Sequence, residues 1–210
     1  MTSVVLVEHP LVSDLLGRAR DERTQPPEFR RTVRHIAALL TYEAARTWPT
    51  EAGEVHTPLG VPASFQRLAP PLPVLVPILR AGLGMLEGAL SVLPQSEVGV
   101  IGLRRDEVTF LPDHYCEALP GEIDGRHAVV LDPMIATGGT IAKACERLVD
   151  RGAERITAIC LIAAPEGLTV LGQRCPRAEV VTAAVDPRID ARAYIVPGLG
   201  DAGARQYGRP

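Results

Sequence analysis

Five short segments of the chain are almost continuously apolar. They are residues 74–78, 98–103, 128–131, 156–162 and 179–184. Alternation of apolar and polar residues is typical of a strand with one solvent-exposed face. An unbroken apolar run of this length is typical of a strand that is covered on both faces. The pattern therefore predicts five buried strands.

Helical spacing of apolar residues separates several of these strands. The expected helices cover residues 83–92, 141–151 and 168–174. Such alternation predicts an α/β fold, in which a mostly parallel five-stranded sheet lies between helices. Ligands bind at the carboxyl ends of the strands in sheets of this kind, so we expect the chemistry in the loops that follow the strands.

The first 70 residues break this alternation. Residues 29–47 carry apolar positions at helical spacing and predict one long amphipathic helix. Its apolar stripe suits either the core of the chain itself or a contact with a second copy, so a homo-oligomer is one expectation. The expected organisation is one domain over 1–210, with an N-terminal helical part (1–70), an α/β core (71–185), a charged projecting arm (104–121) and a C-terminal segment (186–210).

Composition narrows the classes of partner. The chain holds 22 Lys and Arg against 25 Asp and Glu, a net charge of −3. A nucleic-acid partner is not expected, because binding a phosphate backbone needs a basic surplus. No apolar run is long enough to span a bilayer, and the first residues lack a signal-peptide pattern, so we expect no membrane partner and a cytoplasmic location. The four cysteines are too far apart for a Cys-x-x-Cys metal pair.

A predicted strand, an acid and a loop of glycine and threonine follow one another at residues 129–140. Asp132 ends the strand, and Thr137-Gly138-Gly139-Thr140 comes directly before a predicted helix. Glycines let backbone N–H groups approach an anion, the threonines add hydroxyl donors, and the helix N-terminus favours negative charge. Asp132 can accept hydrogen bonds from sugar hydroxyls. The segment predicts a site for a phosphorylated sugar; the alternative interpretation is a well-capped strand–helix turn.

Two other glycine-rich segments resemble a dinucleotide fingerprint. Residues 198–203 match G-x-G-x-x-G, but the seven residues that follow leave no room for the required helix and strand. Residues 82–88 follow a strand, open a helix and have Asp106 roughly 20 residues further on, which permits an NADP site as an alternative. Arg80 stands between that strand and its glycines, where a dinucleotide turn needs no arginine, and this favours a different anion site.

Four segments together resemble the uracil phosphoribosyltransferases. They are Pro-Ile-Leu-Arg-Ala-Gly-Leu-Gly-Met at 77–85, Asp-Pro-Met-Ile-Ala-Thr-Gly-Gly-Thr at 132–140, Ala-Ala-Pro-Glu-Gly at 163–167 and Tyr-Ile-Val-Pro-Gly-Leu-Gly-Asp-Ala-Gly at 194–203. The likeness runs in order from about residue 5 to 208. The segment at 132–140 alone is typical of type I phosphoribosyltransferases in general, whereas the set is specific.

The resemblance implies both a fold and a reaction. It implies the type I phosphoribosyltransferase fold, with a hood formed by the N- and C-terminal segments. The family transfers the 5-phosphoribosyl group of 5-phospho-α-D-ribose 1-diphosphate (PRPP) to uracil, giving UMP and diphosphate in pyrimidine salvage. Mg²⁺ is expected as cofactor, held mainly by PRPP and water, and GTP is expected as an activator.

The resemblance also implies roles for individual residues. The catalytic candidates are Arg80 and Arg105, which contact the phosphates of the donor, and Asp201, on the donor and metal side of the pocket. The expected contacts of the ribose 5-phosphate are Asp132, Pro133, Met134, Ile135, Ala136, Thr137, Gly138, Gly139 and Thr140. The expected uracil contacts are Ile195, Gly200, Asp201 and Ala202. Related enzymes carry a cis peptide in the loop of Arg80, expected here at Arg80–Ala81.

Some positions depart from the family pattern. Arg104 and Val108 flank Arg105 where other residues are common, and Ala204 replaces a frequent aspartate. Two alternative functions therefore stay open at this point. One is a non-catalytic regulator on the same fold that senses PRPP or binds RNA, since fold and donor loop alone do not establish turnover. The other is a phosphoribosyltransferase for another base.

Overall fold

The computed structural model describes residues 3–105, 112–121 and 123–208, and the side chains of residues 104, 105 and 112–114 lie outside this description. The strands are β1 (Ser3–Leu6), β2 (Thr50–His56), β3 (Pro62–Leu68), β4 (Val74–Leu79), β5 (Val100–Arg105), β6 (Pro112–Ala118), β7 (His127–Leu131), β8 (Met134–Ile135), β9 (Arg155–Ala163), β10 (Ala178–Val185), β11 (Arg188–Ile189) and β12 (Ile195–Val196). The helices are α1 (Pro10–Arg20), α2 (Pro26–Ala44), the 3₁₀ turn η1 (Ala45–Thr47), α3 (Leu83–Val92), α4 (Gly139–Asp150), α5 (Pro165–Arg174) and α6 (Ala202–Tyr207).

The central sheet contains all five strands that the apolar runs predict. In its described part the strand order is β1-β10-β9-β7-β4-β5-β6, with the short β8 paired to β9 beyond the end of β7. The strands β10, β9, β7, β4 and β5 are the predicted five, and they pair in parallel. The expected count of five is too low, because β1, β6 and β8 also join the sheet. β1 and β6 lie at the two edges. β6 lacks an apolar run, whereas β1 contains one at residues 4–6 that the five predicted strands do not include.

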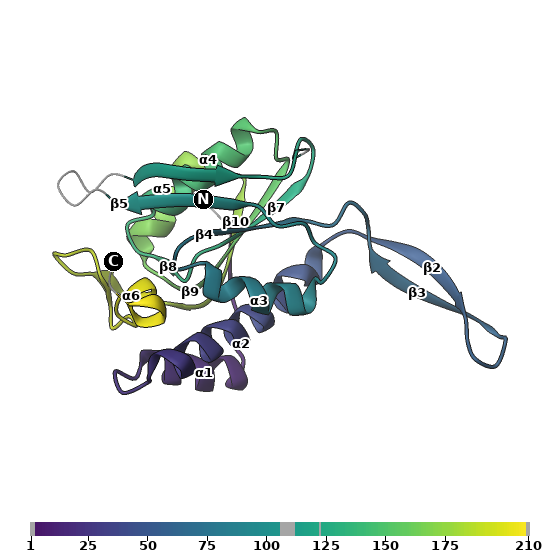
Figure 1. Ribbon diagram of the computed structural model, residues 1–210, viewed down its shortest axis with the longest axis horizontal. Coiled ribbons are helices and arrows are strands. Elements are labelled where there is room, and N and C mark those ends of the chain that lie inside the picture. The colour runs from purple at the N-terminus through teal and green to yellow at the C-terminus, as the bar shows by residue number, and fades with distance from the viewer. Residues whose placement is uncertain (1–2, 106–111, 122, 209–210) are drawn as a thin grey trace.

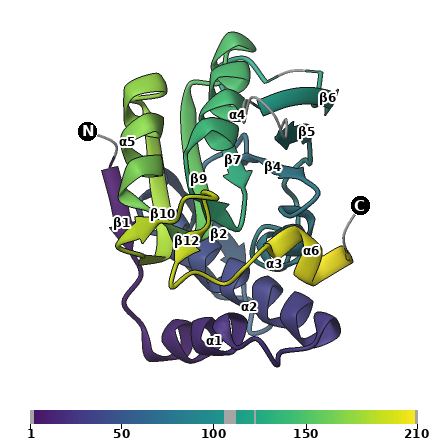
Figure 2. The ribbon, with the colours of Figure 1, turned by 90° about the vertical axis from the view of Figure 1, so that its left-hand side faces the viewer.

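Helices cover both faces of the sheet, as Figure 2 shows. One buried cluster joins α2 and α3 to one face, and a second joins α4 and α5 to the other. The stripe on α2 lies in the first cluster, where Val33, Ile36 and Leu40 have no exposed surface. The interpretation of this stripe as a subunit contact is therefore wrong, because the chain's own sheet covers it.

A long hairpin, β2–β3, extends away from the rest of the molecule (Figure 1). It pairs Thr50 with Leu68 at its base and His56 with Pro62 near its tip. The N-terminal part, expected to be helical, therefore also contains strands. Residues 104–121, expected to form an arm, contribute the last two residues of β5 and all of β6, an antiparallel pair at the sheet edge. Residues 106–111 of that arm lie outside the described part of the chain.

The loop between β7 and α4 is held tightly in place. Ala164 donates its N–H to the carbonyl of Ile135 at 2.9 Å, beside the pairing of β8 with β9. Gly138 has a φ of +79° and caps α4. A Cβ at Gly138 would lie 2.4 Å from the carbonyl oxygen of Gly167 at the start of α5. The loop therefore fits only when residue 138 lacks a side chain.

We expect Gly138→Ala to lower the free energy of unfolding by about 2–4 kcal/mol, since alanine adds both a strained φ and an overlap with backbone. Urea denaturation followed by circular dichroism measures this change. Gly17→Ala is the matched control, because nothing lies within 4 Å of a Cβ added there in α1. The control should be neutral or stabilising by about 1 kcal/mol. Equal midpoints for the two variants would contradict the prediction.

Candidate active site

The loop of Arg80 lies directly against the end of β7. It follows β4, and Gly82 donates its N–H to the carbonyl of Ile78 at 2.8 Å. A Cβ on Gly82 would lie 2.2 Å from the carbonyl oxygen of Leu131, the last residue of β7. Asp132 is the next residue. The two motifs therefore meet at the carboxyl ends of two neighbouring parallel strands, where a ligand site is expected.

The C-terminal segment borders the same loop from the other side. Gln206 in α6 donates from Nε2 to the carbonyl oxygens of Ala81 at 3.0 Å and Ala202 at 3.1 Å. A Cβ on Gly84 would lie 1.6 Å from Oε1 of Gln206, so the helix after the loop also makes room for this amide. In Figure 2, α6 and β12 lie in front of the strand ends. Three segments, of which the first and the last are 125 residues apart in sequence, are thus brought together.

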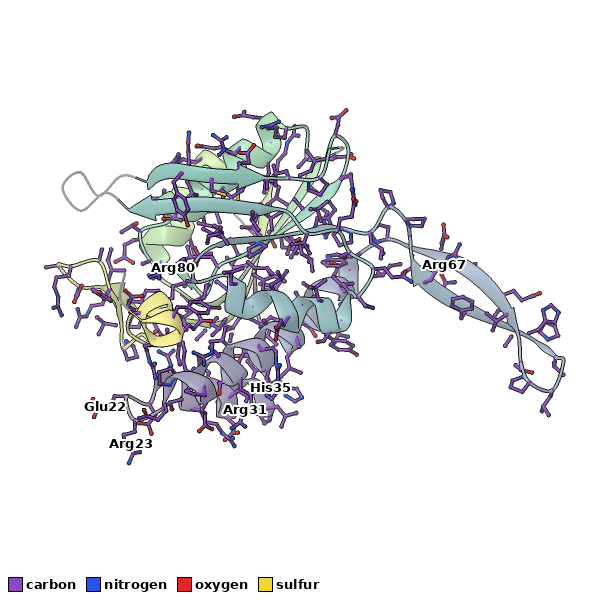
Figure 3. All side chains as sticks on the ribbon, in the orientation of Figure 1. Glu22, Arg23, Arg31, His35, Arg67 and Arg80 are labelled. Atoms are coloured by element: carbon purple, nitrogen blue, oxygen red, sulfur yellow. The ribbon has the colours of Figure 1, made fainter. Side chains whose placement is uncertain are left out.

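Arg80 presents its side chain at this junction. The side chain is exposed, and Nη2 donates to the carbonyl oxygen of Gly208 at 3.4 Å. Figure 3 shows it beside α6, far from Arg67 on the hairpin and Arg31 on α2. The cis peptide of this loop joins Leu79 to Arg80, not Arg80 to Ala81 as expected.

Asp132 is a partly buried acid whose charge is poorly compensated within the chain. Burial raises the pKa of its carboxyl from 3.8 to about 7, although a hydrogen bond from the backbone N–H of Met134, at 3.5 Å, opposes this shift. Desolvation disfavours the charged form, which is the cause of the shift. The carboxyl therefore changes protonation state near neutral pH, an unusual property for an aspartate.

The residues of the 132–140 loop divide into anchors and exposed groups. The backbone carbonyl oxygen of Pro133 accepts hydrogen bonds from the backbone of β9, and the side chain of Ile135 is 1% exposed in the core, so both residues fix the loop. Thr137, Gly139 and Thr140 keep accessible surface. The first N–H groups of a helix have no hydrogen-bond partner within the helix. In α4 no side chain caps them either. Such groups are suited to holding an anion.

The expected uracil contacts form one continuous turn. Ile195 and Ala202 bury their side chains, and Gly200 has a φ of +74°. Asp201 is exposed, and its Oδ1 accepts the N–H of Ala204 at 2.9 Å as the N-cap of α6. With the side chains of Ile195 and Ala202 turned into the core, the backbone of this turn carries its polar chemistry.

Several side chains that hold this turn escaped the sequence analysis. Arg20 and Asp186 form an ion pair at 2.7 Å. Arg205 donates to the carbonyl oxygen of Leu199 at 2.8 Å, and its guanidinium lies 4.1 Å from the ring centre of Phe29. These partners are far apart in sequence and belong to no motif, so spacing gives no signal for them. Arg105 lies in β5, and its side chain is outside the described part of the chain.

Comparison with known proteins identifies the family of the chain. The family model described as uracil phosphoribosyltransferase matches residues 5–209. The chain is 51% identical over 207 residues to the uracil phosphoribosyltransferase of a Nocardioides species, covering 97% of both chains. It is 44% identical over 208 residues to that of Shouchella clausii, covering 99% of both.

Solved structures agree with this result. The AQ2163 protein from Aquifex aeolicus is 38% identical to the chain, with a TM-score of 0.92 and coverage of 98% of both chains. A hypoxanthine-guanine phosphoribosyltransferase from Bacillus anthracis shares the fold alone, with a TM-score of 0.50 and 12% identity over 77% of this chain and 80% of that one. The expected type I fold is confirmed, and the chain belongs to the uracil phosphoribosyltransferase family.

Proposed function

We propose that the site at the ends of β4 and β7 carries the family's reaction, with residues 132–140 holding the ribose 5-phosphate and residues 195–202 holding uracil. One observation carries this assignment. The loop of Arg80 contacts the end of β7 through Gly82 and contacts α6 through Ala81. A single short loop thus separates the donor segment from the acceptor segment, as transfer of a sugar between them requires.

The donor end supplies groups for both the phosphate and the sugar. The N–H groups of the first turn of α4, with the hydroxyls of Thr137 and Thr140, hold the 5-phosphate. Asp132 accepts hydrogen bonds from the ribose hydroxyls. Arg80 pairs with the diphosphate and stabilises the charge that develops on it as it leaves an oxocarbenium-like sugar. Arg105 takes a second diphosphate contact by its family match.

The acceptor end reads uracil through backbone groups near Ile195, Gly200 and Ala202, with Asp201 facing the donor. Uracil offers an acceptor, a donor and an acceptor along one edge, which a rigid backbone can match. Cytosine would bring a donor against a backbone donor, and an unpaired buried group costs about 1–3 kcal/mol. This geometry favours uracil over an amino-substituted pyrimidine.

Mg²⁺ fits this site as an ion carried mainly by the substrate. Among the described residues, no group of three or more His, Cys, Asp or Glu side chains is arranged to hold a metal. Asp132 lies in the donor segment, and Asp201 lies in the segment proposed to hold uracil. Mg²⁺ prefers one or two carboxylates with phosphate oxygens and water, so this donor set suits it. When bound with PRPP, the ion would neutralise charge on the diphosphate.

Other properties follow from the family and from the cysteines. GTP activation is part of the proposal by resemblance, and rate measurements with added GTP test it. All four cysteines are free thiols, which supports a reducing cytoplasmic location. In the described residues, no helix is long and apolar enough to cross a membrane.

Neither a regulator without turnover nor a transferase for another base is favoured, given the names of the near full-length relatives.

The β2–β3 hairpin supports the proposal of a homo-oligomer. Its pairing places Val55, Ala63 and Phe65 on one face, and Val55 is 50% and Phe65 40% exposed. A lone two-stranded hairpin is marginally stable in water. This one extends from the molecule with an apolar face that the chain itself leaves uncovered (Figure 1). A second copy of the chain is the proposed partner for that face.

Arg80→Ala should lower kcat/KM for UMP formation by about 10²–10³-fold, because the leaving diphosphate loses a charge partner. Labelled uracil, PRPP and Mg²⁺ provide the assay. The thermal midpoint should stay near that of the wild type, since Arg80 is exposed. Arg31→Ala on α2 is the control and should be fully active. Wild-type rates in Arg80→Ala would remove this residue from the reaction.

Asp132→Asn should stabilise the protein without ligand at neutral pH. The folded-state pKa of Asp132 is about 7 and its ordinary value is 3.8, so the folded protein keeps a proton that the unfolded chain releases between these values. Wild-type stability therefore falls as pH rises through this window. The variant lacks this loss, so its free energy of unfolding should exceed that of the wild type by about 2–4 kcal/mol between pH 4 and pH 7.

Urea denaturation across that pH range measures the difference, and calorimetry with Mg²⁺ should show weaker PRPP binding by Asp132→Asn. The exposed Asp150→Asn serves as control and should change neither the pH dependence nor the affinity. A variant with wild-type pH dependence and wild-type PRPP affinity would show that the Asp132 carboxyl has neither role.

Phe65→Ser combined with Val55→Thr should dissociate the proposed oligomer, because both changes remove apolar area from the hairpin face. Sedimentation velocity measures the assembled mass against the 22.5 kDa of one chain. Gln66→Ser, on the opposite face of the same strand, should leave the assembly intact. A wild-type protein that sediments as one chain would refute the oligomer.

A further inference from the structure

A largely buried ion pair joins the first helix to the C-terminal segment. Arg20, the last residue of α1, donates from its two terminal nitrogens to the two carboxylate oxygens of Asp186, each at 2.7 Å. Asp186 is 5% exposed. A bidentate pair of this kind fixes the relative orientation of both groups as well as their distance.

This ion pair also binds the backbone N–H and the backbone carbonyl of one residue in the C-terminal segment, Gly198. The N–H of Gly198 donates to Oδ2 of Asp186 at 2.9 Å, and the carbonyl oxygen of Gly198 accepts from Arg20 at 2.7 Å. Gly198 has a φ of +64°, and a Cβ there would lie 2.0 Å from the carbonyl oxygen of Ile195. The orientation of the chain between Ile195 and Gly200 is therefore set at Gly198.

The sheet in turn fixes the position of the ion pair. Asp186 follows β10 directly, and its N–H donates to the carbonyl oxygen of Ala163 at 2.8 Å, at the end of β9. Two core strands thus determine where the carboxylate of Asp186 lies. Through Gly198, that carboxylate determines where the turn at 195–202 lies. Recognition by backbone groups needs such a fixed frame, because a backbone donor has no rotamer with which to adjust.

We propose that Arg20 and Asp186 are positioning residues for the base: together they align the backbone of residues 195–200 with the edge of uracil and so set the preference for uracil over cytosine. This inference rests on the proposed function, in which this turn binds uracil. The carboxylate and the guanidinium act through Gly198 and not by touching the base.

Arg20→Lys tests the assignment. Lysine keeps the charge but has one nitrogen in place of the planar fork. It therefore loses the second bond to the carboxylate of Asp186, which orients Nη1 toward both Asp186 and Gly198. The KM for uracil should rise about tenfold, and the ratio of kcat/KM for uracil to that for cytosine should fall about tenfold, the size expected for one misaligned backbone hydrogen bond. The KM for PRPP should stay within about twofold of the wild type, because the donor loop is held by β9 and α5 instead.

Arg174→Lys is the matched control. Arg174 forms a bidentate pair with Glu146 at 2.7 Å between α5 and α4, with no contact to the C-terminal turn. This variant should leave both KM values and the base preference unchanged. If Arg20→Lys fails to unfold cooperatively, Asp186→Asn provides the same measurements, since asparagine keeps an acceptor for Gly198 and loses the charge pair.

Two outcomes would overturn the inference. One is an unchanged KM for uracil in folded Arg20→Lys; the other is an equal rise in the KM values for uracil and PRPP, which would indicate general loosening. Hydrogen exchange on the wild type separates these from a failure of the proposed function. Protection of the amides of 195–202 by uracil with PRPP supports the base site itself, and its absence would refute that site whatever the variants show.

Discussion

The functional end of this protein depends on backbone segments that approach one another more closely than any side chain allows. The carbonyl of Leu131 occupies the space where a Cβ of Gly82 would be, and the carbonyl of Gly167 does the same for Gly138. The first contact joins the Arg80 loop to the end of β7, and the second joins the donor loop to α5. Close packing of this kind leaves little freedom of movement, so the glycines fix the geometry of the Arg80 loop and of the donor loop.

The parts that could be predicted from sequence are those whose signal is local. The run at 74–78 is buried on both faces and appears as β4, and the helix expected at 83–92 has the bounds observed for α3. The loop at 132–140 was interpreted from residue chemistry within one short segment. The hairpin β2–β3 lacks that signal, because most of its residues are exposed, whereas the short apolar run of β1 was present but was not recognised as a strand. The Arg20–Asp186 pair lacks it as well, since 166 residues separate its members.

Positive groups lie at the proposed site, although the whole chain has a net negative charge. A net charge of −3 argues against a polyanionic partner, yet Arg80 and the first turn of α4 follow two neighbouring parallel strands, β4 and β7, at the end of the sheet where a phosphorylated sugar is proposed to bind. Asp132 adds a carboxyl to the same place, and burial makes its charge unfavourable until a partner arrives. An acid there lowers the free energy of unfolding as the pH rises toward 7, which fits its proposed role in binding.

The two halves of the site are built by different means, and this has a consequence for specificity. The donor loop is continuous with β7 and α4, so its geometry follows from the core of the fold. The turn at residues 195–202 is held by Arg20 from α1, by Asp186 after β10 and by Gln206 in α6, none of which belongs to the donor loop. Changes in these contacts can move the turn at residues 195–202 while the donor loop stays fixed by its glycine contacts. We therefore infer that base preference can change on this fold without loss of donor binding, because the contacts at Gly198 are separate from the glycine contacts of the donor loop, although both segments are anchored at the end of β9.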